Sequence, residues 1–149
     1  MRLTKAGEYA VRCALYLAGR EKEEVVNRKQ IAEEMEIPDP FLAKIAQQLA
    51  HAGIIEIVQG RRGGLRLIVP PSDLTLLDVV EAAIGEIFLN DCVMRPSSCH
   101  RSPSCTVHQV WEKARNQLRN TLKEVTFADL LNKGSCINPL PSDPESEGD

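Results

Sequence analysis

The sequence contains few aromatic residues and no long apolar run. Aromatic residues make up 4% of the 149 residues and hydrophobic residues 43%, so the core must be built mainly from aliphatic side chains. No stretch is long and apolar enough to span a membrane. The first residues lead into a polar-punctuated helix without the apolar core of a signal peptide. We therefore expect a cytoplasmic protein without a membrane partner.

Recognisable catalytic motifs are also missing. The chain has no glycine-rich loop of the kind that binds nucleotides, and no nucleophile stands at a recognisable spacing from a general base. We therefore expect that the protein is not an enzyme. Its length suits one compact domain, or one domain with an appendage.

An overall excess of positive charge is missing too, since the formal net charge is −3. Residues 1–69 contain 11 Lys and Arg against 9 Asp and Glu, whereas residues 70–149 contain 7 against 12. A protein that binds nucleic acid needs a local positive face rather than a basic chain as a whole. Such a face is therefore expected in the N-terminal half.

The N-terminal half predicts three helices in the order of a helix-turn-helix unit. Thr4 can cap a helix over residues 4–19, and Asn27 can cap a short second helix. Asp39 as the N-cap and Pro40 as the first helical residue predict a third helix that runs to residue 52. Its apolar stripe faces inward and its polar side chains face outward, as a recognition helix in the DNA major groove requires.

A β-hairpin is predicted after the third helix. Residues 54–58 and 65–69 have the composition of strands, and the glycine-rich segment between them carries Arg61 and Arg62. A thin, positively charged tip suits the narrow minor groove of DNA, so the order of elements predicts a winged helix-turn-helix that binds DNA. The residues that we expect to contact DNA are Arg2, Thr4, Lys5, Arg28, Asp39, Pro40, Phe41, Lys44, Gln48, Arg61, Arg62 and Gly63.

The C-terminal half predicts a long helix from Cys105 to about Glu124. Thr75 opens a helix before it, residues 85–104 are irregular, and Thr126 caps a last short helix over residues 127–132. The apolar positions of the long helix form a narrow stripe, which suits a seam between two subunits better than burial in a broad core. Packing within one subunit is the alternative. The side chains expected in the seam are Trp111, Leu118 and Leu122.

The number of cysteines is odd, five, which argues against a disulfide framework. Cys92, Cys99 and Cys105 share one polar segment, with His100 and His108 close by in the sequence. Their spacings are too wide for a zinc knuckle and suit a loop wrapped around a larger group, such as an iron–sulfur cluster. A zinc ion held by three cysteines and a histidine, and a thiol–disulfide switch without a metal, are the alternatives.

The segments that carry these features resemble those of a known family of regulators. The residues from Met1 to Arg12, the wing from Gly60 to Leu67, the three clustered cysteines and the closing segment from Thr126 to Leu131 are similar to those of the IscR, NsrR and RirA regulators. The resemblance extends to about residue 132. It implies a homodimer with a long swapped dimerisation helix. It also implies an iron–sulfur cluster that tunes DNA affinity and reports iron, cluster supply, nitric oxide or redox stress.

The resemblance offers two alternatives for the fourth cluster ligand. The segment from Cys105 to Trp111 resembles the Cys-x2-His-x2-Trp pattern of IscR-type members, in which His108 would be a ligand of a 2Fe–2S cluster. Glu8 falls where NsrR-type members use a carboxylate ligand, and it would favour a 4Fe–4S cluster. We favour His108 and 2Fe–2S, because His108 lies three residues after Cys105 and returns to the same helix face. Glu8 has a simpler role open to it, an ion pair with Arg12 one helical turn on.

Two departures limit what can be carried over from any one member. The spacing from Cys92 to Cys99 is one residue longer than in IscR-type members, and Ala43 stands where those members have a glutamate in the recognition helix. The sensed signal and the operator sequence therefore remain open.

The sequence as a whole predicts a mainly α-helical fold with a small β-wing, and a DNA-binding transcription regulator that acts as a repressor. We expect a winged helix-turn-helix domain over residues 1–71, a cluster-binding loop and a dimerisation helix over residues 72–134, and a disordered acidic tail over residues 135–149. Because the dimer would be symmetric, its operator should be an imperfect palindrome. The alternatives are a regulator that senses through zinc or thiols, and an iron–sulfur assembly partner that does not bind DNA.

Overall fold

A computed structural model of the protein describes residues 3–132, and Arg2 and the predicted acidic tail lie outside them. Across residues 3–132, no helix combines the length and the apolar character that crossing a membrane requires. In chain order the elements are α1 (Lys5–Ala18), α2 (Arg28–Glu34), α3 (Asp39–His51), β1 (Ile55–Val58), β2 (Gly64–Leu67), α4 (Leu76–Ile84), α5 (Asp91–Met94), the 3-10 turns η1 (Pro96–Ser98) and η2 (Ser102–Ser104), α6 (Thr106–Lys123) and α7 (Phe127–Asn132).

The central helix of the core is α1. Thr4 caps its N-terminus as predicted, since the Thr4 hydroxyl accepts the backbone N–H of Gly7 at 3.3 Å. Ala10, Cys13 and Ala14 are fully buried. Their small side chains allow α3, α4 and α7 to pack closely against α1, which brings both halves of the chain onto one core.

The strands β1 and β2 form an antiparallel hairpin in which Ile55 lies opposite Leu67. On its other side Leu65 pairs with Val26 in the segment before α2. A Cβ at Gly64 would lie 2.1 Å from the carbonyl oxygen of Val26, so only glycine permits this close approach. The hairpin is thereby tied to the body next to its turn, and residues 59–63 project beyond this contact.

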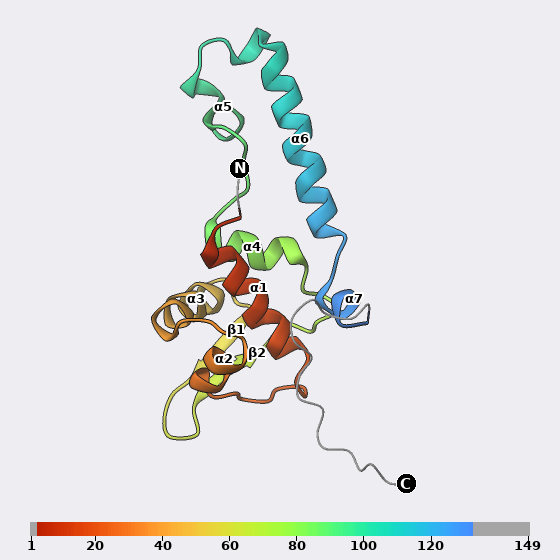
Figure 1. The fold of residues 1–149 in the computed structure, drawn as a ribbon. Coiled ribbons are helices and arrows are strands. Elements are labelled where there is room, and N and C mark those ends of the chain that lie inside the picture. The colour runs from red at the N-terminus through yellow and green to blue at the C-terminus, as the bar shows by residue number, and fades with distance from the viewer. Residues whose placement is uncertain (1–2, 133–149) are drawn as a thin grey trace.

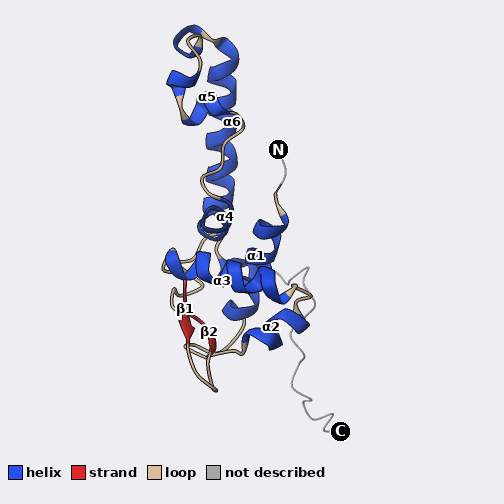
Figure 2. Cartoon of the chain, turned by 90° about the vertical axis from the view of Figure 1, so that its left-hand side faces the viewer, coloured by secondary structure: helices blue, strands red, loops and turns tan. Residues whose placement is uncertain are grey.

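An arm projects from the body and consists of α6 together with the segment that contains α5, η1 and η2 (Figures 1 and 2). Cys105 is the N-cap residue of α6, and α5 packs against α6. At the base of the arm, Arg119 forms an ion pair of 2.7 Å with Glu81 on α4. None of the 18 residues of α6 is buried, so the long helix keeps most of its surface accessible.

The last described helix, α7, returns the chain to the core. Thr126 and Asp129 cap each other's backbone N–H groups at 3.0 and 3.1 Å, as predicted. Phe127 is fully buried, and its N–H donates to the carbonyl of Leu74 at 2.9 Å. The predicted fold class is confirmed: the described residues form a mainly helical, winged-helix structure with one small hairpin.

Candidate DNA interface and cysteine loop

A polar face of α3 points away from the core. Leu42, Ile45 and Leu49 are buried, whereas Lys44 and Gln47 are exposed. The hairpin lies on the same side of α1 as α3 (Figure 1). A recognition helix and a wing in this arrangement can approach one DNA duplex together.

Asp39 does not cap α3 as predicted. Pro38 occupies the N-cap position and Asp39 is the first helical residue. Its carboxylate instead accepts two hydrogen bonds from the guanidinium of Arg28, from Nε at 3.1 Å and from Nη2 at 3.3 Å. Both side chains are nearly half exposed, so the pair contributes little to stability. It does neutralise the Asp39 carboxylate on the face expected to meet phosphates.

Gln47, rather than Gln48, lies on the open face of α3. Gln48 is half-buried, and its Oε1 has no hydrogen-bond partner within residues 3–132. Gln47 instead lines a cavity of about 390 Å³ together with Lys29 at the start of α2 and Gly60 in the hairpin. The buried positions of α3 could have revealed this, because they place residue 47 nearer to the centre of the opposite face than residue 48.

The tip of the hairpin is a tight turn. The N–H of Gly63 donates to the carbonyl of Gly60 at 3.0 Å, and Gly60 has a φ of 102°, which favours glycine. Arg61 and Arg62 occupy the two central positions of the turn and are exposed. Neither forms an ion pair with any residue that the structure describes. Both guanidinium groups are therefore available to an anionic partner.

Near the N-terminus, Glu8 does not pair with Arg12. Its carboxylate accepts a hydrogen bond from Lys5 at 3.1 Å, and the expected ion pair one turn further on is not formed. Arg12 instead donates to the carbonyl of Met35 at the end of α2 at 3.3 Å. The ion pair with Glu8 therefore partly neutralises the charge of Lys5. Thr4 caps the N-terminus of α1.

The cysteine loop brings His108 close to two of the three clustered cysteines. Nδ1 of His108 lies 3.3 Å from Sγ of Cys92, and the backbone N–H of His108 donates to Sγ of Cys105 at 3.4 Å. Cys92, Cys99 and Cys105 are free thiols of intermediate exposure. Along residues 3–132, no three Cys, His, Asp or Glu side chains converge closely enough to hold a single metal ion.

The donor set of this loop fits an iron–sulfur cluster. A cluster with two irons takes its protein ligands in pairs, one pair at each iron, so they need not converge on one point. The Cys92–His108 contact places one thiol beside one imidazole, as such a pair would require. Ser102, between Cys99 and Cys105, is buried, and its hydroxyl has no hydrogen-bond partner among the described residues. The sulfur atoms of a cluster beside Ser102 would accept a hydrogen bond from this hydroxyl.

Glu8 lies in a groove at the base of the arm. It lines an apolar groove of about 750 Å³ between α1, α4 and α6, to which Leu118 and Leu122 also contribute. An α-helix rises about 1.5 Å per residue, so Leu118 lies roughly 20 Å along α6 from Cys105. The groove that contains Glu8 therefore lies towards the opposite end of α6 from Cys105.

Cys13 is separate from the clustered cysteines. It is fully buried in the core of α1, and burial raises the pKa of its thiol to about 12. A thiol that stays protonated is a poor nucleophile and a poor metal ligand. Cys13 is therefore a core residue.

The apolar stripe of α6 changes its environment along the helix. Leu118 and Leu122 pack partly against Leu77 and Val80 of α4 in the same chain. Towards the N-terminal end of α6, Trp111 is 39% exposed and Val107 and Val110 are 51% and 60% exposed. Only the outer part of the stripe thus lacks cover within the chain that the structure describes.

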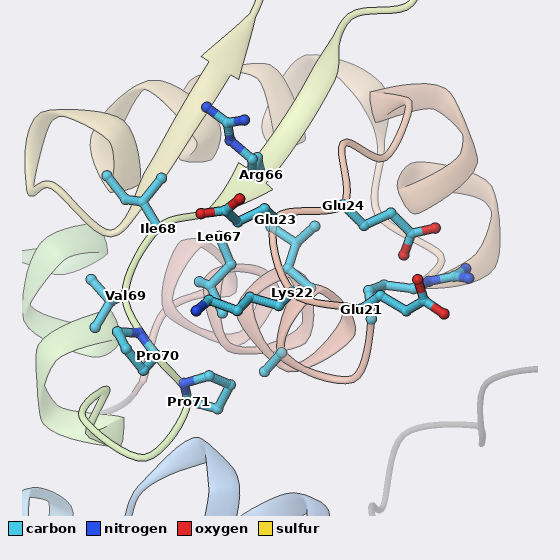
Figure 3. Close-up of a pocket in the computed structure, with 13 residues that line it drawn as sticks. Glu21, Lys22, Glu23, Glu24, Arg66, Leu67, Ile68, Val69, Pro70 and Pro71 are labelled. Carbon is cyan, nitrogen blue, oxygen red and sulfur yellow. The ribbon is translucent and has the colours of Figure 1, made fainter.

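A further cavity, of about 410 Å³, lies between the loop after α1 and the end of β2 (Figure 3). Glu21, Glu23 and Glu24 stand beside Lys22 and Arg66 on its walls, and Pro70 and Pro71 close one end. None of the residues that the sequence predicts for DNA or cluster binding lines this cavity. Its mixed charge differs from the positive character expected of a DNA-binding face.

Comparison with known proteins identifies relatives over nearly the whole chain. The family model Rrf2, described as an iron-dependent transcriptional regulator, matches residues 3–133. A regulator named NsrR from Geobacillus kaustophilus is 32% identical over 94% of this chain and 96% of its own length.

Solved structures give the same result. IscR from T. potens is 26% identical with a TM-score of 0.71, covering 89% of this chain and 88% of its own. The oxidised form of CymR from Staphylococcus aureus is 27% identical with a TM-score of 0.66, covering 87% of this chain and 95% of its own. These matched proteins are transcription regulators and not enzymes.

Proposed function

The chain belongs to the Rrf2 family of transcriptional regulators, and from that premise we propose that it is a cytoplasmic, homodimeric repressor whose operator affinity is tuned by an iron–sulfur cluster. Regulation of transcription through DNA is the property of the family. The cluster, its ligands, the dimer and the sign of regulation are the proposed parts.

In this proposal α3 enters the major groove and the hairpin tip enters the adjacent minor groove. The exposed side chains of Lys44, Arg61 and Arg62 supply positive charge on that side of the molecule. The Arg28–Asp39 pair removes a repulsive carboxylate from it, and Gln47 adds a polar side chain next to the wing. Since a dimer would present two such units, the operator is an imperfect palindrome.

The cluster would be held by Cys92, Cys99 and Cys105, with His108 as the fourth ligand. The observation that carries this assignment is the 3.3 Å approach of the His108 ring to the Cys92 sulfur, across 16 residues of sequence. Capping of α6 by Cys105 fixes the first turn of the helix from which His108 projects. When bound, the cluster supplies a redox-active centre that can also lose or exchange ligands.

The dimer would use the exposed stripe of α6. Trp111, Val107 and Val110 stay 39–60% exposed within the described chain. An α6 from a second copy is the proposed partner, with Leu118 and Leu122 at the inner end of the seam. A second copy would also bring its own Glu8 within reach of the cysteine loop. That geometry keeps Glu8 as the alternative fourth ligand, in trans.

The experiment that tests the cluster is purification of the full chain without oxygen, followed by an absorbance spectrum and by iron and sulfide analysis. We expect equal amounts of iron and sulfide, and visible absorption that disappears in air or with nitric oxide. DNA selected from a random pool by the same preparation should then be bound with different affinity by the cluster-loaded and the cluster-free protein.

A thiol switch is the second candidate, favoured by a specific observation. The three clustered cysteines are free and half-exposed, and one structurally similar protein is an oxidised form of CymR. This candidate predicts a protein without iron or sulfide whose DNA affinity changes on treatment with a thiol oxidant and recovers with a dithiol. Stoichiometric zinc in the purified protein would favour a zinc site instead.

A further inference from the structure

Phe41 is an apolar side chain in a polar surface. It lies in the first turn of α3 and is 50% exposed, with exposed Asp39 and Pro40 before it and exposed Lys44 one turn later. Isolated exposed apolar residues are common and by themselves need no explanation. What distinguishes Phe41 is that its ring is held in place from outside α3.

Tyr9 on α1 holds that ring. The centroids of the Tyr9 and Phe41 rings are 5.8 Å apart and the rings are inclined at 65°, the edge-to-face arrangement that aromatic pairs prefer. Tyr9 is in turn covered by the guanidinium of Arg12, 5.4 Å from its ring centroid. Arg12 is anchored by a hydrogen bond to the carbonyl of Met35 at the end of α2. All three helices of the DNA-binding unit therefore contribute to the placement of one exposed phenyl ring.

The position of Phe41 in the first turn of α3 determines which part of the DNA its ring can contact. The N-terminal residues of a recognition helix are those that contact base edges in the major groove. In that groove the C5-methyl group of thymine is the apolar group of the base edges, and a phenyl ring is a suitable contact for it. Lys44, one turn along the same side of α3, is suited to a phosphate or a guanine instead.

We propose that Phe41 reads the C5-methyl group of a thymine in each operator half-site, and that Tyr9 is the positioning residue that holds Phe41 in place. This inference rests on the proposed placement of α3 in the major groove. It makes Phe41 a determinant of specificity rather than a general contributor to affinity, since other base pairs lack the methyl group at that position.

The test uses full-length protein and a duplex that the protein itself selects from a random pool. Each thymine is replaced singly by deoxyuridine, which removes only the methyl group, and affinities are measured at one salt concentration. Loss of one buried methyl group is expected to weaken binding about four-fold, at one position in each half-site. Replacement at both symmetric positions should weaken binding roughly fifteen-fold.

Substitutions in the protein test whether this loss of affinity on deoxyuridine replacement, the deoxyuridine penalty, depends on Phe41. In Phe41→Ala the deoxyuridine penalty should vanish, whereas Phe41→Leu should keep part of it. Lys44→Ala is the matched control, because it should lower affinity for every duplex and leave the penalty unchanged. Tyr9→Leu should reduce the penalty, and Tyr9→Phe should preserve it because the edge-to-face contact needs the ring and not the hydroxyl.

The outcomes separate the inference from the function on which it rests. If the protein selects no duplex, DNA binding by this face fails and the inference fails with it. If a duplex is bound tightly but no thymine shows a penalty, or if Phe41→Ala shows the same penalty as the unaltered protein, the regulator stands and the role of Phe41 is overturned. If Tyr9→Leu keeps the full penalty, Tyr9 is not the positioning residue.

Discussion

Nδ1 of His108 lies 3.3 Å from Sγ of Cys92, although 16 residues separate them in the sequence. The contact joins the first turn of α6 to α5 across the loop that carries Cys99. Within one chain Glu8 instead lines the same groove as Leu118, at the base of the arm. The structure therefore separates the two alternative ligands in space, which makes them experimentally distinguishable.

The first prediction concerns the fourth ligand. Replacing His108 with Ala should abolish the reconstituted cluster or shift its visible spectrum, because an iron that loses its imidazole must take water or an exogenous ligand. Glu8→Ala should leave the spectrum unchanged. The measurement is anaerobic reconstitution followed by absorbance and circular dichroism in the visible range.

His100→Ala is the matched control for that prediction, since His100 belongs to the same loop and is exposed. It should reconstitute as the unaltered chain does. An unaltered spectrum in His108→Ala together with loss of the cluster in Glu8→Ala would show that the ligand comes from α1, and hence from the second subunit.

The second prediction concerns the hairpin tip. Replacing both Arg61 and Arg62 with Ala should weaken operator binding by about 2–4 kcal/mol, taking ~1–2 kcal/mol for each phosphate or minor-groove contact. The slope of log affinity against log salt should fall by about two, one for each lost contact. Both side chains are exposed and unpaired within residues 3–132, so the fold should be unaffected.

A double variant of Lys22 and Lys123 removes the same charge from exposed positions outside the hairpin. It should leave the salt slope nearly unchanged. If it matches the Arg61 and Arg62 variant, the effect is one of net charge, and the hairpin tip does not contact DNA.

Helix caps were the part of the fold most readily predicted from the sequence. Thr4, Thr75 and Thr126 each begin a helix as expected, because a cap depends only on residues within one turn of each other. The sequence determines ion pairs less well than helix caps. Glu8 has a possible partner one turn away in each direction along α1, and in the structure it pairs with Lys5 rather than Arg12.

Contacts between distant segments could not be predicted in the same way. Asp39 pairs with Arg28 instead of capping α3, and the packing of α2 against α3 brings those two residues together. The approach of His108 to Cys92 depends on the path of the loop between them. The Tyr9–Phe41 contact likewise depends on the packing of α1 against α3.

The third prediction concerns Cys13. Its pKa of about 12 leaves only roughly one thiol in 10,000 ionised at pH 8, and the thiolate is the form that alkylating reagents attack. In metal-free native protein, iodoacetamide should label Cys92, Cys99 and Cys105 while the peptide that carries Cys13 stays unmodified by mass spectrometry. Labelling in guanidinium should modify Cys13 as well. Modification of Cys13 as fast as Cys92 under native conditions would contradict its burial.

The fourth prediction concerns the seam of α6. Trp111 is 39% exposed in the single chain, so Trp111→Glu should not prevent folding. In a dimer seam the same carboxylate would be buried without a partner, which a hydrophobic interface does not tolerate. Leu118→Glu should also break the seam, but it is a less clean test because Leu118 packs against α4 in its own chain.

Asn116 provides the matched control, since it is exposed on the side of α6 away from the apolar stripe. Sedimentation velocity should give a monomer for Trp111→Glu and a dimer for Asn116→Glu, with the same helical circular dichroism in both. A monomer should also bind palindromic DNA far more weakly, because it loses the second recognition helix. A stable dimer of Trp111→Glu would mean that the stripe is covered within one subunit, and that any dimer forms through another surface.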